Sequence, residues 1–201
     1  MSKLIPIVAG VTGTAIIGAG GGYLLSTQNT KTIKDSFKPA LIKLDNSEEE
    51  LLKIKLTKLK TGTIFSGNKK LKEAQDKEKT TTNSGLADLK KACQEIYDSG
   101  FTNKNSDTFK DFQAYCAKTN KDKVAKGKWA IDDSTAQWKT KHEKLKNPKS
   151  SLIAELNQIA NTKSTNGEEL KTWCKNNGEL VFEGDEDKTF KNIEEFCTKD
   201  S

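Results

Sequence analysis

Four cysteines and one histidine are the residues of this chain that could support redox, nucleophilic or metal chemistry. The cysteines stand singly, and the same 23 residues separate the members of each successive pair: Cys93 and Cys116, Cys174 and Cys197. Zinc sites use close Cys-x-x-Cys pairs or clustered Cys and His, so this spacing favours disulfides over a metal. Four cysteines allow three pairings. Equal spacing favours bonds within each successive pair over bonds between the pairs, and four reduced, buried thiols in a cytoplasmic domain are the alternative.

Catalytic residues are not indicated elsewhere. His142 lies in "WKTKHEKLK", where we expect an exposed helical histidine, and nothing singles out a nucleophile to pair with it. The acidic run "EGDED" (183–187) lacks the alternating ligand spacing of a calcium loop. We therefore predict no catalytic, cofactor-binding or metal-binding residues, no cofactor, and no enzyme. The alternative, a tethered hydrolase or thiol enzyme, would need a pocket that gathers His142 with cysteine and carboxylates.

The cysteines belong to a repeated segment. Residues 89–118 align without gaps to residues 170–199, at a constant offset of 81, with Leu, Lys, Cys, Thr-Phe-Lys, Cys and Lys in common. Two copies that share so many positions indicate an internal duplication. The sequence therefore predicts two related units, 86–118 and 167–201, each containing one cysteine pair.

Each copy has the pattern of a helical hairpin. Apolar residues recur at spacings of three and four on both sides of a polar connection, which is typical of two helices facing one core. Ser106 or Asp107 is placed to cap the second helix of the first copy, and a residue within 185–187 does so in the second. The predicted buried residues are Leu89, Ala92, Cys93, Ile96, Phe109, Phe112 and Cys116, then Trp173, Cys174, Phe190, Ile193 and Cys197.

The remaining body also reads as mostly α. Residues 27–85 are predicted to form a polar, basic linker and helical segment, with a helix near 47–60 capped by Ser47 and Glu50. The stretch 72–85 is polar enough to be a linker or a solvated helix end. Residues 119–166 are predicted to be connecting helices, near 132–146 and 151–160, separated by Pro148.

Residues 4–25 are uncharged over 22 positions, and such a helix spans about the 30 Å thickness of a bilayer core. We predict a single transmembrane helix within an N-terminal membrane anchor, residues 1–26, with a cleaved signal peptide as the alternative. Small residues recur every fourth position, which would allow self-association through the anchor, although glycine is also common in membrane helices. This packing ridge consists of Gly10, Thr14, Gly18 and Gly22.

Two signals disagree about orientation. Four lysines follow the apolar segment and only Lys3 precedes it, so the positive-inside rule would place the body in the cytoplasm. Disulfides form on the oxidising side and would place the body outside. We give the cysteines more weight and predict a single-pass membrane protein with an extracellular body.

Composition limits the partners. All 34 basic residues are lysine, and without arginine's planar guanidinium we expect no specific nucleic-acid recognition. Residues 53–79 are basic and residues 168–201 are acidic, so an anionic surface is a possible partner alongside a host protein. Only 33% of the residues are hydrophobic, which predicts a thin core that disulfides would reinforce.

The "MSKL" start with its Gly-rich segment, the Lys-rich body of about 200 residues and the "WC" and "FC" dipeptides resemble the large paralogous families of short, membrane-anchored proteins of haemotropic mycoplasmas. The resemblance covers the first 25 residues and the cysteine units. It implies display on the surface of a wall-less cell, with host contact or immune evasion and without established catalysis. We expect a host-interaction or antigenic module whose polar loops, 99–107 and 178–187, are exposed and bind different ligands. A cytoplasm-facing, membrane-tethered scaffold is the alternative.

Overall fold

The computed structural model describes residues 31–162 and 166–199. In these ranges the chain is helical with four isolated β-bridges, which confirms the predicted mostly α fold for this part of the protein. No helix in the described ranges is long and apolar enough to span a bilayer. The predicted membrane segment 4–25, with its ridge at Gly10, Thr14, Gly18 and Gly22, lies outside the described residues.

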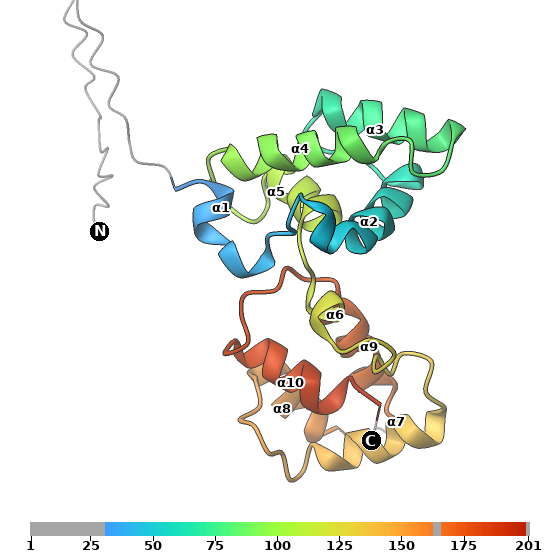
Figure 1. Cartoon of the computed structure of the whole chain (residues 1–201). Helices are drawn as coiled ribbons and strands as arrows, with labels where there is room; N and C mark the ends of the chain where they lie inside the picture. Colours follow the sequence, from blue (N-terminus) through green and yellow to red (C-terminus); the bar gives the residue numbers. More distant parts are fainter. Residues whose placement is uncertain (1–30, 163–165, 200–201) are drawn as a thin grey trace, which may run out of the picture.

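The described residues form two stacked groups of helices (Figure 1). The first unit, residues 31–118, contains α1 (Ile33–Ser36), α2 (Glu49–Thr61), α3 (Lys69–Thr80), α4 (Leu86–Asp98) and α5 (Asp107–Asp111). It also has the 3-10 turns η1 (Lys38–Ala40) and η2 (Asn46–Glu48) and a π-helical turn, η3 (Phe112–Cys116). The second unit, residues 118–199, contains α6 (Asn120–Lys123), α7 (Thr135–Lys144), α8 (Ala154–Ala160), α9 (Glu168–Gly178) and α10 (Lys188–Phe196).

Each unit encloses its own apolar core. The first core collects buried residues from α1 to η3 and also takes in Val181 from the second unit. The second core lies among α7 to α10 and includes Trp138, Trp173 and Phe196. Burial of apolar area contributes roughly 25 cal/mol per Å², so each core, although small, stabilises its own group of helices.

The two predicted hairpins are α4 with α5 and η3, and α9 with α10. Their second helices begin with equivalent caps: Ser106 accepts a hydrogen bond from the N–H of Phe109, and Asp187 accepts one from the N–H of Phe190. Such a side chain satisfies a main-chain donor that the helix itself leaves unpaired. Ser106 and Asp187 stand 81 residues apart, so the caps keep the offset of the repeat.

The repetition extends beyond the hairpins to the whole unit. The β-bridges of the first unit recur in the second, with the hairpin partners again shifted by 81 positions. The short first helices also correspond: the N–H of Thr32 donates to Asp35, and that of Thr119 donates to Asp122. The corresponding bridges are Thr32–Gly100 with Thr119–Val181, and Leu41–Ala117 with Trp129–Thr198.

The long helices α2 and α7 are equivalent as well. Their buried positions follow the same spacing: Leu52, Lys55, Leu56 and Leu59 in α2, and Trp138, Lys141, His142 and Leu145 in the α7 region. The described residues between the hairpins, 119–162, therefore form the first part of a second unit as well as connecting the two hairpins. This equivalence places His142, which is 2% exposed, where the first unit has a buried leucine; the expectation of an exposed histidine was wrong.

The polar stretch 72–85, expected to be a linker or a solvated helix end, is helical through Thr80 as part of α3. Leu71 and Ala74 bury one face of this helix, and the side-chain amide of Gln75 donates to the main-chain oxygens of Leu59 and Gly62. The apolar stripe is narrow because only one side of α3 faces the core. The polar composition of this stretch therefore does not reveal that it packs as a helix.

Lys118 joins the two units without a separate linker. Its main-chain N–H donates to the carbonyl of Ala40 in the first unit, and its carbonyl accepts from the N–H of Phe182 in the second. The equivalent bonds elsewhere are Phe101 N–H to Lys31 carbonyl, and Lys199 N–H to Lys128 carbonyl. One residue thus closes the first unit and opens the second.

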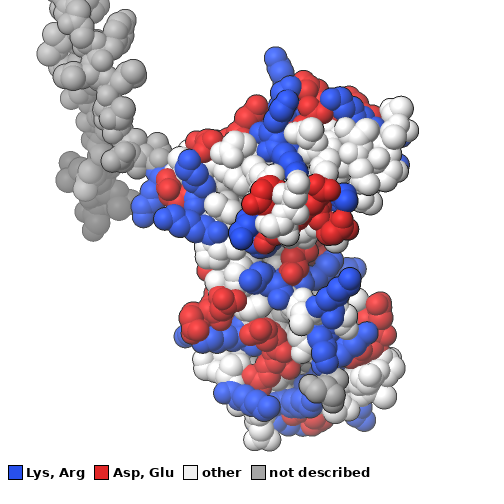
Figure 2. Space-filling model, in the orientation of Figure 1, with Lys and Arg blue, Asp and Glu red and all other residues white. Residues whose placement is uncertain are grey.

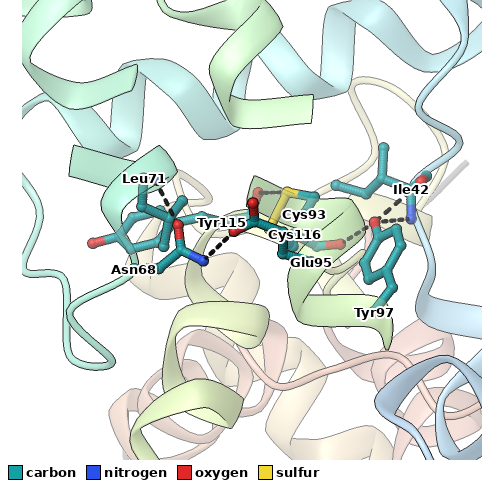
Figure 3. Close-up of a disulfide and its surroundings, with 8 residues drawn as sticks. All are labelled: Ile42, Asn68, Leu71, Cys93, Glu95, Tyr97, Tyr115 and Cys116. Carbon is teal, nitrogen blue, oxygen red and sulfur yellow. Dashed lines mark hydrogen bonds between the residues drawn. A yellow bond between two sulfur atoms is a disulfide. The ribbon is translucent and has the colours of Figure 1, made fainter. Parts of the chain in front are cut away.

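Tyr97 and Gly178 occupy equivalent positions, but a large side chain fills the space in the first unit and there is no room for one in the second. The Tyr97 hydroxyl accepts from the N–H of Ile42 and lies 2.6 Å from the carbonyl of Cys116, to which it donates (Figure 3). In the second unit the equivalent main-chain groups bond directly, Ala130 N–H to Cys197 carbonyl. A Cβ at Gly178 would come within 2.6 Å of the Trp129 ring, which explains the glycine.

Candidate functional site

The cysteine sulfurs lie at disulfide-bonding distance within each copy, as predicted. The Sγ–Sγ distance is 2.01 Å both for Cys93 with Cys116 and for Cys174 with Cys197. The cysteines are at most 1% exposed, so a dissolved substrate cannot reach the sulfurs. The bonds close loops that join the two helices of each hairpin, and such cross-links stabilise a fold. Figure 3 shows the pair Cys93 and Cys116 with its surroundings.

His142 is closed off in the second core. Its Nε2 lies 3.0 Å from the main-chain oxygen of Ile159, and its Nδ1 has no hydrogen-bond partner among the described residues. Within those residues, no group of three His, Cys, Asp or Glu side chains is placed to hold a metal ion. The histidine packs as a core residue at the position that Leu56 fills in the first unit.

A cleft of about 390 Å³ lies between the two units. The first unit contributes Lys104, Phe109 and Gln113 to its walls, and the second contributes the remainder. Clefts of this size accommodate a small ligand or a side chain of a partner, and an apolar wall with a few polar groups is their usual composition. The residues from the second unit are Asn120, Leu180, Val181, Glu183, Asp187 and Thr189.

The cleft brings together the two polar loops that the sequence singled out. Lys104 in loop 99–107 forms an ion pair with Glu183 in loop 178–187, with 2.5 Å between Nζ and Oε1. We expected these loops to bind different ligands because their charges differ. Because they share one cleft, a single ligand can contact both.

Asn120 is the polar residue that the sequence analysis missed. It is 3% exposed and lines the cleft, and its Nδ2 donates to the carbonyl of Asn177. Its Oδ1 has no hydrogen-bond partner among the described residues, although buried amide oxygens are nearly always paired. The signal in the sequence that points to it is a gapped alignment of the two units that matches Asn120 to Ile33.

Beside the cleft, the units are held together by ion pairs. Lys55 on α2 is 3% exposed and lies 2.5 Å from Asp122, the third residue of α6. Burial lowers the pKa of Lys55, and the charge of Asp122 opposes that shift in part. A buried lysine is costly unless it is paired, so this contact requires the second unit to stay in place.

Glu179, at the end of α9, is the second ionic contact between the units. Its carboxylate is 3.0 Å from Lys58 of the first unit and 2.8 Å from Lys121 of the second. Burial alone would raise the pKa of Glu179, but the hydrogen bonds and charges of the two lysines lower it to about 2. The side chain of Gln113 also donates to the Glu179 carbonyl.

We expect Glu179→Gln to lower the free energy of unfolding by about 0.5–1 kcal/mol at pH 7, because both ion pairs are partly exposed. The folded pKa of Glu179 is depressed from 4.5 to about 2, so this stabilisation is present above pH 4.5 and is lost as the pH falls towards 2. Urea unfolding of variant and wild type at several pH values measures the difference. Glu186→Gln, at a pair in which Glu186 is 90% exposed, is the control and should change little. A difference that persists at pH 2 would contradict the assignment.

Charge elsewhere on the surface is mixed. On the face shown in Figure 2, lysines and acidic residues are interspersed over both units. Several lysines of the basic stretch 53–79 are paired with nearby carboxylates, so the stretch does not act as isolated positive charge. These pairs are Lys53–Glu49, Lys70–Glu73, Lys72–Asp76 and Lys77–Asp88.

The lining of the cleft combines polar and apolar groups. Its lining residues include two carboxylates, one lysine, an apolar wall and Asn120, whose buried amide oxygen has no partner among the described residues; such groups can orient a ligand. Comparison of the chain with models of known protein families, with curated proteins and with solved structures finds no match.

Proposed function

We propose that this chain is a membrane-anchored surface protein that binds a host protein and does not catalyse a reaction. The uncharged segment 4–25 supports the anchor, and the cysteine pairs support a body on the oxidising side of the membrane. The resemblance to the anchored protein families of haemotropic mycoplasmas supports display to a host. The single observation that carries the binding role is the cleft between the two units.

The cleft is suited to recognition because rigid helices support variable loops. Loops 99–107 and 178–187 each join two helices that are linked by a cysteine pair, so substitutions in the loops leave the frame in place. The Lys104–Glu183 pair then sets how the two loops meet. Sequence changes in either loop would alter the shape and charge of one common surface.

On intact cells that express the protein, we expect added protease to digest the body, because the body faces outward. Alkaline carbonate extraction should leave the full-length chain in the membrane pellet. The measurement is an immunoblot of the body before and after protease treatment, with lysed cells as the digestion control. Protection on intact cells followed by digestion after lysis would place the body inside and favour a cytoplasm-facing scaffold.

The same cells test the cleft. We expect Glu183→Lys to reduce binding of host-cell extract proteins, because it puts two lysines in contact at the meeting point of the loops. Lys126→Glu, an exposed change in the connection between α6 and α7, is the control and should leave binding intact. Equal binding by both variants would show that the cleft does not take part in binding the host protein.

A further inference from the structure

The two units provide an internal comparison for the cleft. Bonds to loop 99–101 in the first unit and to loop 180–182 in the second are equivalent, so residues 81 positions apart can be compared directly. At the cleft, the second unit has larger apolar side chains or carboxylates where the first unit has small neutral residues. The replacements are Leu180 for Ser99, Val181 for Gly100, Glu183 for Thr102 and Asp187 for Ser106.

Asn120 shows the same divergence inside the fold. The N–H of Ile33 donates to the carbonyl of Ser99, and the N–H of Asn120 donates to the carbonyl of Leu180, so the two positions are equivalent. Ile33 is 1% exposed and belongs to the first core. The unit therefore folds with an apolar side chain at this place. A buried amide whose oxygen is unpaired among the described residues adds an acceptor that the fold does not need, and leaving such a group unpaired is destabilising.

The polar groups at the cleft are mainly acceptors. Asn120 has its unpaired Oδ1, and Glu183 and Asp187 carry negative charge, against the single cation Lys104. Asp187 also caps α10 by accepting from the N–H of Phe190. Phe109, Leu180 and Val181 form the apolar part of the wall. A ligand that fits must donate hydrogen bonds, carry positive charge and have a short aliphatic stem.

We propose that the cleft binds an arginine or lysine side chain of a partner protein, with the cationic head at Asn120, Glu183 and Asp187 and the stem against Phe109, Leu180 and Val181. This inference rests on the proposed binding function and names its ligand class. The head displaces Lys104 from Glu183, so the cleft exchanges an internal cation for an external one. Arginine fits best, because its guanidinium can donate to several acceptors at once.

The test uses the full-length chain in non-ionic detergent with its disulfides intact. The probes are three blocked tripeptides with arginine, lysine or citrulline between two glycines; citrulline has nearly the shape of arginine but no charge. Calorimetric titration gives the affinities. The arginine peptide should bind, the lysine peptide should bind as well or somewhat less tightly, and the citrulline peptide should bind at least about tenfold more weakly.

Variants then locate the site. Asn120→Ile restores the residue type of the first unit and should fold, but it should weaken arginine binding about tenfold. Glu183→Gln should also weaken it, whereas Lys104→Ala removes the competing cation and should leave binding equal or tighter. Circular dichroism checks the fold of each variant, and the citrulline comparison stands on wild-type protein even if Asn120→Ile fails to fold.

The outcomes separate this inference from the proposed function. Equal affinity for arginine and citrulline, or unchanged binding in both Asn120→Ile and Glu183→Gln, overturns the inference even where the body is exposed on cells. Arginine binding with the expected variant effects supports the inference even if protease shows the body to be inside, in which case only the proposed location and host partner fail.

Discussion

Replacing Cys93 and Cys116 together with alanine should lower the free energy of unfolding by about 3 kcal/mol. The bond closes a loop with a sequence separation of 23, and a cross-link of that size removes roughly this much conformational freedom from the unfolded chain. The pair Cys174 and Cys197 has the same separation, so its removal should have a similar effect. For small cores such as these, the loss is a large part of the total stability.

The tryptophans allow the two units to be followed separately. Trp129, Trp138 and Trp173 all lie in the second unit, so their fluorescence reports on that unit, whereas circular dichroism reports on both. In the variant without Cys93 and Cys116, urea should change the dichroism before the fluorescence. In the variant without Cys174 and Cys197, urea should change the fluorescence before the dichroism. Wild-type protein in reductant is the matched control. Its unfolding curve should match that of a variant in which all four cysteines are replaced.

A chain whose unfolding is the same with and without reductant would show that the bonds do not form in the native protein. Non-reducing peptide mapping gives an independent answer, because it distinguishes bonds within each copy from bonds between copies. Bonds between copies would contradict the structure of both hairpins.

Replacing Asp111 with alanine should destabilise the first unit by about 2–4 kcal/mol. The Asp111 carboxylate is fully buried and accepts hydrogen bonds from the N–H groups of Phe65 and Ser66 and from the Ser66 hydroxyl. These bonds fix the connection between α2 and α3 onto the end of α5. Removal of a buried charged acceptor leaves its donors unpaired, and this loss exceeds that of an exposed pair.

The second unit supplies a matched comparison. Asn192, 81 residues after Asp111, accepts from the N–H of Ile153 and donates to Ser150, fixing the connection between α7 and α8. Asp111→Asn should therefore cost less than Asp111→Ala, about 1–2 kcal/mol, since one acceptor remains. Asp107→Ala, at an exposed carboxylate on α5, should change stability by less than about 0.5 kcal/mol. Denaturant unfolding of the three variants gives the order, and equal losses for alanine and asparagine would contradict the role given to the acceptor.

The hairpins could be predicted because the features that define them are local. Cysteine spacing, apolar periodicity and capping residues all lie within one ungapped alignment, and the caps at Ser106 and Asp187 follow directly from it. The earlier half of each unit could not be recognised in this way. Equivalent residues there are offset by 87 at Thr32 and Thr119 but by 86 at Lys55 and Lys141. The first correspondence rests on main-chain contacts and the second on the spacing of buried residues.

The cleft was only partly predictable, for a related reason. Loops 99–107 and 178–187 were identified from polar composition, but their meeting depends on how the second unit docks on the first. That docking uses the buried pair of Lys55 and Asp122, and nothing in the local sequence distinguishes this lysine from its solvated neighbours. The unpaired oxygen of Asn120 becomes notable only by comparison with Ile33, and the two residues are matched by their main-chain contacts in the structure.

The join at Lys118 defines how one unit follows another along the chain. The same operation that docks the second unit on the first would place a third unit after Lys199, as in repeat proteins whose stability is a sum of neighbouring interfaces. The receiving face has changed, however. Glu194 stands where Gln113 donates to a carbonyl, and Asp185 stands where Lys104 pairs with a carboxylate. Both changes place a carboxylate where the first unit has an amide or a cation, so the outer face of the second unit differs in charge from the face that receives it.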